Sequence, residues 1–345
     1  MTFGKHGEIT TGLRNERKRL SLDATSADRE NVTMGFIEND RHSLLARRIN
    51  EINFVPTAFR VSLQIATLRI DVLSCSNRIL NWVTSYFSAY IASANDAPDA
   101  EIFITASSEL QDAALWNDSD AEFHSYDGFV AQRDFVARVD ESGRVLALIG
   151  SVHDDAIFNL FRWLCPPLLL KRNAFLLHGA AVVRDQRAYV FFGQSGAGKT
   201  TTTTLISSID EQAIVLGDDS VIVQLLTDGT PIAHAAPFGS SYLKVPPPNV
   251  TTPIDALFAL EQSDFHRIEK LSPAAGMAAL LASAMSIRFT DEVDTRFELA
   301  CRFSKSHAAI HKLYFQKDPM FWNMILSRKN YETKENERIQ NQSQI

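Results

Sequence analysis

An apolar strand that leads directly into a glycine-rich loop, followed by a helix, is the feature that most constrains how this chain folds. The strand pattern is Tyr189-Val190-Phe191-Phe192, and Leu205 and Ile206 lie in the expected helix. The loop between them matches G-x-x-x-x-G-K-[ST] without mismatch, as Gly193-Gln194-Ser195-Gly196-Ala197-Gly198-Lys199-Thr200. A strand, a tight turn and a helix start in this order predict a phosphate-binding loop, the Walker A motif.

The chemistry of such a loop follows from its residue types. Glycines allow positive φ angles, so successive backbone N–H groups face one point, and the helix start adds partial positive charge. We expect Lys199 to reach the β- and γ-phosphate oxygens, Thr200 to offer its hydroxyl to Mg²⁺, and Thr201 to complete the phosphate-facing turn. The predicted ligand is ATP with Mg²⁺, with GTP left open.

A second acidic element follows the loop helix. The apolar strand Ala213–Leu216 is followed by Gly217-Asp218-Asp219 and resembles a Walker B element. One carboxylate at such a strand end can hold Mg²⁺ while its neighbour accepts a proton from an attacking hydroxyl. Adjacent strand residues point to opposite faces, so sharing this work requires a kink, which Gly217 permits. The alternative interpretation is a surface turn that closes a hairpin.

One histidine lies in the apolar strand upstream of the loop. His178 is in Phe175–Val183, fifteen positions before Gly193. A single histidine within a strand is more often a core residue with satisfied hydrogen bonds than a functional group. Its spacing therefore does not assign it a role.

Composition excludes several classes of protein. The 345 residues include 34 Lys and Arg against 41 Asp and Glu, a formal net charge of −7, which gives no reason to expect a nucleic-acid partner. The three cysteines form no C-x-x-C pair, so we expect neither a disulfide framework nor a cysteine zinc site. The apolar run Phe161–Leu170 is too short to cross a bilayer, and the N-terminus lacks a signal-peptide pattern. We expect a cytoplasmic protein without membrane contact.

The chain divides into four predicted regions. Residues 1–30 and 329–345 are polar and lack apolar periodicity, so we expect a disordered leader and a disordered tail. Residues 31–152 are predicted to form a small α+β domain, and residues 153–328 the domain that carries the loop. In the first domain the expected strands are Phe59–Ile65, Leu68–Leu73, Glu101–Ile104 and the hairpin Phe135–Val139/Val145–Ile149, and the expected helices are Asn77–Ser93 and the connecting Asp154–Leu164.

Beyond the acidic pair, the pattern predicts structural elements only. We expect a hairpin at Gln224–Thr230, strands at Ala256–Leu260 and Leu313–Phe315, and a short helix from Asp318-Pro319. Ser272-Pro273 predicts a helix start, with Ser as N-cap and Pro in the first turn. No chemistry is assigned to this part.

Three segments together resemble the catalytic core of the HPr kinase/phosphorylase family, which is similar in fold to ATP-dependent phosphoenolpyruvate carboxykinase. They are Leu177-His178-Gly179-Ala180, the glycine loop, and Leu216-Gly217-Asp218-Asp219-Ser220-Val221, and the resemblance covers residues 175–238. It implies an α/β fold: a P-loop kinase domain of the HPr kinase/phosphoenolpyruvate carboxykinase type, with a mixed, β-rich sheet and helices, preceded here by the small α+β domain.

The resemblance also implies roles. His178 would lie near the transferred phosphate, Lys199 and Thr200 would contact phosphate and metal, Asp219 would accept the proton, and Asp218 would help to hold Mg²⁺. The implied reaction transfers the γ-phosphoryl group of ATP to a hydroxyl, with serine of a peptide or small protein as the expected acceptor. The layout is closer to short HPr-kinase-like serine kinases than to the bifunctional enzymes.

The sequence departs from this family in two places. The stretch after the acidic pair, Gln224–Thr230, lacks the family's second magnesium-binding glutamate. The family's phosphate-contacting arginine has no clear counterpart; Lys244 and Arg267 are the candidates. The alternatives are a nucleotide-hydrolysing or nucleotide-binding regulatory protein without kinase activity, and a metabolite kinase or carboxykinase whose substrate is a small acid. The oligomeric state, including a homo-oligomer, stays open.

Overall fold

The computed structural model describes residues 46–55, 58–93, 96–107, 124–126, 128–132, 135–150, 154–238, 249–285 and 292–328. The contacts divide the chain into two compact units, Met1–Ile52 and Asn53–Ile345. In the first unit the described part is a helical turn over residues 46–51 followed by Ile52. The predicted leader, the predicted tail and Lys244 lie outside the described residues. The predicted domain boundaries stay predictions.

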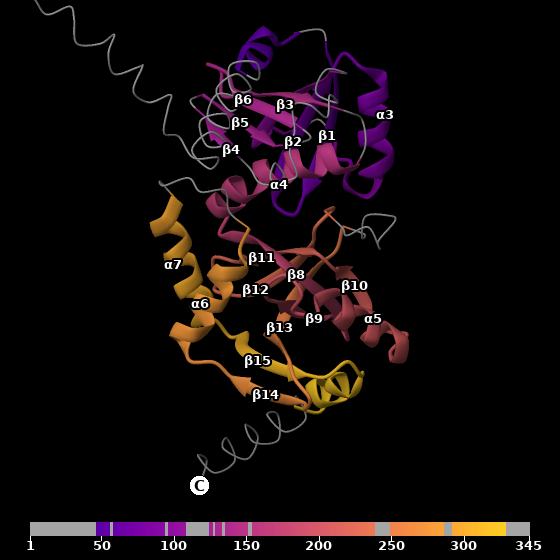
Figure 1. Cartoon of the computed structure of the whole chain (residues 1–345), viewed down its shortest axis with the longest axis vertical. Coiled ribbons are helices and arrows are strands. Elements are labelled where there is room, and N and C mark those ends of the chain that lie inside the picture. The colour runs from indigo at the N-terminus through magenta and orange to yellow at the C-terminus, as the bar shows by residue number, and fades with distance from the viewer. Residues whose placement is uncertain are drawn as a thin grey trace, which may run out of the picture. The chain divides into compact units, whose positions relative to one another are not determined.

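The second unit begins with a mixed sheet whose described strands are ordered β1-β2-β3-β7-β6-β5-β4 (Figure 1). The expected hairpin at 135–149 is confirmed, because β6 and β7 pair antiparallel from Phe135↔Ile149 to Val139↔Val145. The expected helix from Asn77 is shorter than predicted, since it ends at Tyr86 and a 3-10 turn, η1, covers Ser88–Tyr90. The bounds are β1 Phe59–Ile65, β2 Leu68–Ser74, α3 Asn77–Tyr86, β3 Ala100–Ala106, β4 His124–Tyr126, β5 Phe129–Gln132, β6 Phe135–Val139 and β7 Val145–Ile149.

A long helix, α4 (Asp154–Lys171), connects this sheet to the next and is longer than the sequence predicts. Two prolines, which remove backbone donors and normally stop a helix, lie just beyond the expected end near Leu164. Here α4 runs through both of them, Pro166 and Pro167. Buried side chains on both sides of the prolines, including Phe161 and Leu169, join the core of the first sheet. Burial of this apolar face outweighs the local cost of the prolines.

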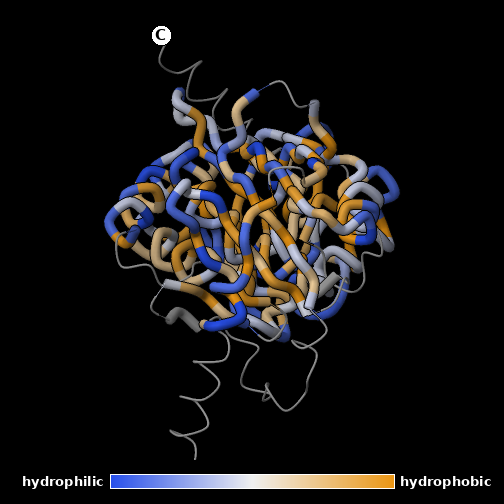
Figure 2. The backbone as a smooth tube through the Cα atoms, turned by 90° about the horizontal axis from the view of Figure 1, so that it is seen from above, coloured by the Kyte–Doolittle hydropathy of each residue, from blue (hydrophilic) through white to orange (hydrophobic). Residues whose placement is uncertain are grey.

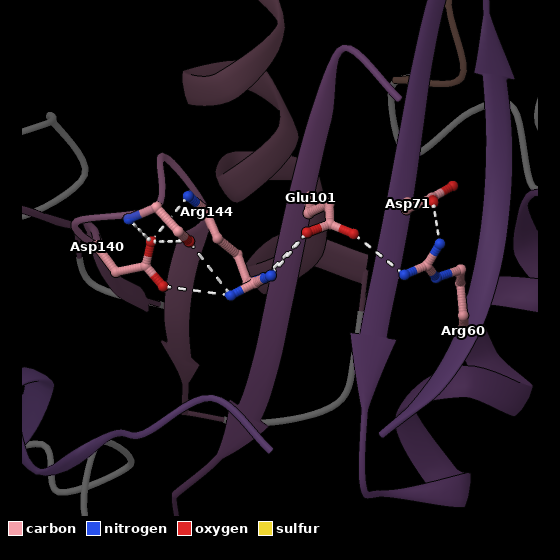
Figure 3. Close-up of polar contacts among 6 residues, drawn as sticks. Arg60, Asp71, Glu101, Asp140 and Arg144 are labelled. Carbon is pink, nitrogen blue, oxygen red and sulfur yellow. Dashed lines mark hydrogen bonds and ion pairs between the residues drawn. The ribbon is translucent and has the colours of Figure 1, made fainter. Parts of the chain in front are cut away.

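Opposite charges alternate across the strands of the first sheet (Figure 3). Asp71 and Glu101 lie directly opposite each other on β2 and β3, and Arg60 of β1 contacts both, at 3.0 and 3.1 Å. On the other side, Arg144 binds Glu101 through Nε and Nη2, at 3.1 and 2.9 Å, and lies 3.5 Å from Asp140. Two like charges can therefore face each other in the sheet because arginines flank them.

The second sheet carries the glycine loop, and its described strands follow the order β10-β8-β11-β12-β13-β15-β14, with β9 paired to β8 and β13. β9 and β13 are parallel, as are β13 and β15. Tight turns join the antiparallel neighbours: Asp185 and Gln186 both adopt positive φ between β8 and β9. The bounds are β8 Ala174–Arg184, β9 Arg187–Phe192, α5 Lys199–Ile209, β10 Ile214–Gly217, β11 Ser220–Leu225, β12 Pro231–Ala235, β13 Thr251–Gln262, β14 Arg267–Lys270, α6 Pro273–Ser283, α7 Val293–Ser304 and β15 Ala309–Phe315.

Several local predictions for this half are confirmed. β11 and β12 form the hairpin expected around 224–230, with Leu225 opposite Pro231. The side chain of Ser272 caps α6 by accepting a hydrogen bond from Ala275 N–H at 3.3 Å. A final helix covers residues 320–328, and its start is held by Asp318, which accepts a hydrogen bond from Met320 N–H at 2.8 Å.

Neighbouring residues on the central strands of this sheet pack into different cores. On β9, Val190 belongs to the core that includes residues of α6 and α7, whereas Phe191 belongs to the core that includes Ile206 of α5 and residues of the last helix. This alternation is the two-residue repeat of a strand buried on both faces. Figure 2 shows the result, with hydrophobic stretches gathered in the interior and hydrophilic ones at the periphery. In the described part of the chain, every helix is too short or too polar to cross a membrane.

The charge network of the first sheet predicts the effect of Arg144→Ala. This side chain is 18% exposed, binds Glu101 twice and stacks on Phe54, with its guanidinium carbon 3.7 Å from the ring centroid. Its removal leaves Glu101 opposite Asp71 with one arginine instead of two. We expect the free energy of unfolding to fall by about 1–3 kcal/mol.

Urea denaturation checks this expectation. Glu141→Ala, at an exposed position in the same turn, is the matched control and is expected to change the free energy by less than about 0.5 kcal/mol. Equal effects of the two substitutions would contradict the stabilising role of the network.

Candidate functional site

Strand pairing brings three segments that are distant in sequence to one edge of the second sheet. In the β8–β9 pair Gly179 lies opposite Phe192, so the preceding residue, His178, lies beside the start of the glycine loop. In the β8–β11 pair His178 lies opposite Ser220, the residue after Asp219. The backbone pairing of β8 with β9 and β11 thus places His178 between the glycine loop and Asp219.

The loop itself adopts the conformation that its glycines predict. Gly193, Gly196 and Gly198 have φ angles of 155°, 80° and 103°, in the region where other residues are strained. The Ala197 N–H donates to the Gln194 carbonyl at 3.1 Å and closes the turn. Gly198 is required for a second reason, because a Cβ atom there would lie 2.7 Å from Cζ of Phe315. Phe315, at the end of β15, therefore packs directly against the loop.

The threonine run that starts the loop helix is stabilised by local hydrogen bonds. Thr202 Oγ1 donates to the Gly198 carbonyl at 2.9 Å, and Thr203 and Thr204 both donate to the Thr200 carbonyl, at 3.0 and 2.8 Å. Such bonds to the preceding turn satisfy the hydroxyls of residues that otherwise form helices poorly. Thr202 and Thr203 are also buried. Their role is structural, and Thr200 and Thr201 are the threonines that reach the cavity.

Lys199 points back over the loop. Its side chain is 6% exposed, and Nζ donates to the carbonyls of Gly193 and Gln194 at 3.1 and 3.0 Å. Burial lowers the pKa of Lys199, and the nearby negative charge of Asp219 opposes that shift. The two hydrogen bonds hold Nζ of this lysine at the loop.

The acidic pair lies in a short bend between β10 and β11, called the acidic turn here. Both strands pair antiparallel with β8, so the turn does not close a hairpin between them. Gly217 permits the turn, since a Cβ atom there would lie 2.3 Å from the Ser220 carbonyl oxygen. The two acids then differ. Asp218 is buried and its carbonyl accepts a hydrogen bond from Thr200 Oγ1 at 3.4 Å, whereas Asp219 lines the cavity.

Asp219 and His178 contact each other through backbone and side chain. Nδ1 of His178 lies 3.1 Å from the Asp219 carbonyl oxygen and 3.4 Å from Asp219 Oδ1. A carbonyl oxygen only accepts, so the proton of the ring is on Nδ1 and the lone pair is on Nε2. Burial lowers the pKa of His178, the positive charge of Lys199 lowers it further, and Asp219 opposes both. At neutral pH the ring is uncharged, with one hydrogen-bond acceptor available.

An arginine that the sequence did not single out completes this group. Nη2 of Arg162, on α4, lies 2.7 Å from Oδ2 of Asp219. The two residues are 57 positions apart, and Arg162 belongs to a helix that the sequence marked only as a connection. Nothing in the local pattern distinguishes Arg162 from an ordinary surface charge on an amphipathic helix.

A cavity of about 340 Å³ lies over the loop. It brings together most of the predicted site residues, and the predicted Gly193, Gln194, Ala197 and Asp218 are outside its lining. Two further residues reach it: Gln262, whose Nε2 donates to the Gly196 carbonyl at 2.6 Å, and Lys317. The lining residues are His178, Ser195, Gly196, Gly198, Lys199, Thr200, Thr201, Asp219, Gln262 and Lys317.

The positions of Gln262 and Lys317 follow from parallel strands. β9, β13 and β15 run in the same direction, so their carboxyl ends meet at one edge. Gln262 is the last residue of β13, and Lys317 lies two residues after the end of β15. A correct strand order would have identified both. Of the earlier candidates for a phosphate contact, Arg267 lies on β14, pairs with Glu269 and stacks on Tyr314, outside this lining.

Two oxygen-bearing side chains near the loop, those of Thr200 and Asp218, are the ones that could hold Mg²⁺. The Thr200 hydroxyl lies beside the Asp218 backbone, and the buried Asp218 carboxylate belongs to the same turn. In the described residues no group of three or more His, Cys, Asp or Glu side chains could hold a metal ion. Magnesium does not require one, because it commonly takes one or two protein oxygens and completes its shell with substrate phosphates and water.

Comparison with known proteins gives one family. A family model described as SynChlorMet cassette protein ScmC matches residues 153–326. Among solved structures, the chain matches the Hpr(Ser) kinase/phosphatase from Coxiella burnetii at 12% identity, over 47% of this chain and 98% of that one, with a TM-score of 0.25. No curated protein matches the chain. A TM-score this low carries no argument about the fold, so the resemblance to the HPr kinase family depends on the sequence motifs alone.

The contact beneath the loop predicts a large effect of Gly198→Ala. The added Cβ atom would have to displace Phe315 and would also impose a positive φ on alanine. Gly229→Ala is the matched control, because Gly229 has a φ of 85° and a Cβ atom added there would meet nothing within 4 Å. We expect Gly198→Ala to lower the free energy of unfolding by about 1–3 kcal/mol more than the control does.

Chemical denaturation of both variants measures this difference. Phe315→Leu, added to Gly198→Ala, is expected to recover part of the loss because it removes the clashing ring atom. Equal stability of the two alanine variants would show that Phe315 does not restrict the loop.

Proposed function

We propose that this chain, which belongs to the family of the SynChlorMet cassette protein ScmC, is an ATP- and Mg²⁺-dependent kinase that transfers the γ-phosphoryl group to a hydroxyl. The expected acceptor is a serine of a peptide or small protein. The single observation that carries the proposal is the shared cavity of a glycine loop, its lysine, a histidine and a carboxylate.

The loop supports polyphosphate binding on physical grounds. Its backbone N–H groups lie at the start of α5, where the helix dipole adds positive charge, and no side chain caps that end. Lys199 and Lys317 add two cationic side chains to the cavity. Since phosphoryl transfer depends mainly on positioning and on charge stabilisation, such a concentration of donors is what the reaction requires.

The protein groups then divide the remaining work. Asp219 accepts the proton of the acceptor hydroxyl as its oxygen forms a bond to the γ-phosphorus, while the bond from that phosphorus to the bridging oxygen breaks and ADP leaves. His178 contacts Asp219 through Nδ1 and helps to hold this residue in place. Thr200 and Asp218 would hold Mg²⁺, which when bound neutralises phosphate charge.

Lys199→Ala tests the phosphate-binding half of the proposal. The substitution removes the buried positive charge at the centre of the loop, and we expect nucleotide affinity or turnover to fall by about 10²–10³-fold. Titration with a fluorescent ATP analogue and a steady-state assay measure the two quantities. Lys171→Ala, an exposed lysine at the end of α4, is the control. Unchanged affinity together with unchanged turnover would exclude this lysine from the site.

Asp219→Asn tests the chemical half. The amide keeps the size of the carboxylate but cannot accept a proton, so we expect transfer to fall by about 10²–10⁴-fold while ATP binding is largely kept. Candidate peptides incubated with ATP and Mg²⁺, and read by the mass shift of one phosphate, report the transfer. A fully active Asp219→Asn variant would remove this residue as the base. ADP release without a phosphorylated product would instead favour a nucleotide-hydrolysing protein.

A further inference from the structure

Arg162 contacts the carboxylate of Asp219, although no motif includes this arginine. It comes from the middle of α4, its side chain is 31% exposed, and Nη2 lies 2.7 Å from Asp219 Oδ2. The other carboxylate oxygen, Oδ1, lies 3.4 Å from Nδ1 of His178. The carboxylate is thus held between a helix outside the loop motif and the strand that carries the histidine.

The helix is rigidly placed, so this contact is not that of a free surface side chain. Phe161, the residue before Arg162, is fully buried and its ring packs against Phe238, with centroids 6.3 Å apart. The carbonyl of Phe238 in turn accepts a hydrogen bond from Ser220 Oγ, next to Asp219. Both partners of the ion pair are anchored to the same buried cluster, which reduces the entropy lost in forming the pair.

The charges explain what the contact does. Asp219 and Lys199 line the same cavity, and the negative charge of Asp219 acts on the lysine. Without a second cation, the carboxylate would attract Lys199 away from phosphate and would repel the γ-phosphate itself. Arg162 binds one carboxylate oxygen, Oδ2, and supplies a balancing positive charge.

We propose that Arg162 is a positioning residue that holds Asp219 against His178 and away from Lys199, so that the lysine stays available to polyphosphate. The inference rests on the proposed function, since it assumes that the cavity binds a nucleotide. It goes further by adding a helix outside the loop motif to the site and by assigning a binding role to its arginine.

A double-mutant cycle on nucleotide affinity tests this without knowledge of the acceptor. The full-length chain is titrated with a fluorescent ATP analogue and Mg²⁺ as wild type, Arg162→Gln, Asp219→Asn and the double variant. In the wild-type background Arg162→Gln is expected to weaken binding about tenfold, because Asp219 then competes for Lys199. In the Asp219→Asn background the same change is expected to weaken binding less than about twofold.

Two further variants separate positioning from folding. Arg162→Lys keeps the charge and is expected to restore most of the affinity. Arg172→Gln removes another arginine that pairs with a carboxylate, here Asp99 at 2.5 Å and outside the cavity, and is expected to leave affinity unchanged. Circular dichroism melting of each variant confirms that it is folded at the assay temperature.

The titration of His178 gives an independent readout. The charged groups that face its ring are Lys199 of α5, Asp219 of the acidic turn and Arg162 of α4, and Arg162 lowers the pKa of the ring. Its removal is therefore expected to raise the pKa of His178, which NMR of the imidazole measures. A structural loss at a distance would leave this value in place.

The outcomes distinguish the two proposals. A folded wild-type protein that binds no nucleotide would reject the proposed function, and with it this inference. Nucleotide binding by wild type with an unchanged Arg162→Gln variant, or with equal losses in both backgrounds, would reject the role of Arg162 alone. A loss confined to the background that contains Asp219, with rescue by lysine, supports it.

Discussion

The antiparallel pairing of β8 with β9 and with β11 is the constraint on which the site depends. In the pairing with β9, His178 precedes Gly179, which lies opposite Phe192, the last residue before the glycine loop. In the pairing with β11, His178 lies opposite Ser220, beside the acidic turn. A shift of register by one residue would turn the histidine to the other face and separate it from both. The hydrogen bond from Gly179 N–H to the Asp219 carbonyl, 3.1 Å, fixes the register at this point.

Neighbouring groups compensate the charges of Lys199 and Asp219 beside that pairing. Lys199 is held by two loop carbonyls, Asp219 by Arg162, and His178 is kept neutral by burial and by the lysine. Burying a charge is costly unless hydrogen bonds or an opposite charge compensate it. The compensating groups come from the glycine loop, α4 and α5. The site is therefore a property of the folded sheet and its neighbouring helices, although its most visible motif is a single loop.

Sequence reasoning reached the parts of the site that depend on local chemistry. The glycine loop, the strand before it and the turn at Gly217 each require particular residues at particular positions, and the structure has them as expected. It missed Gln262 and Lys317 because their place depends on strand order, and Arg162 because its partner is 57 residues away. It also ended α4 too early, since tertiary burial outweighed the prolines.

The extent of the family match adds a point about α4. The match begins at residue 153, one residue before the helix starts, and so includes all of α4 together with the second sheet. The apolar residues of that helix share a buried core with residues of both sheets, and Arg162 reaches the acidic turn of the second sheet. Covering the first sheet does not require the contact between Arg162 and Asp219. Its inclusion in the matched segment is what we expect if α4 forms one functional unit with the glycine loop.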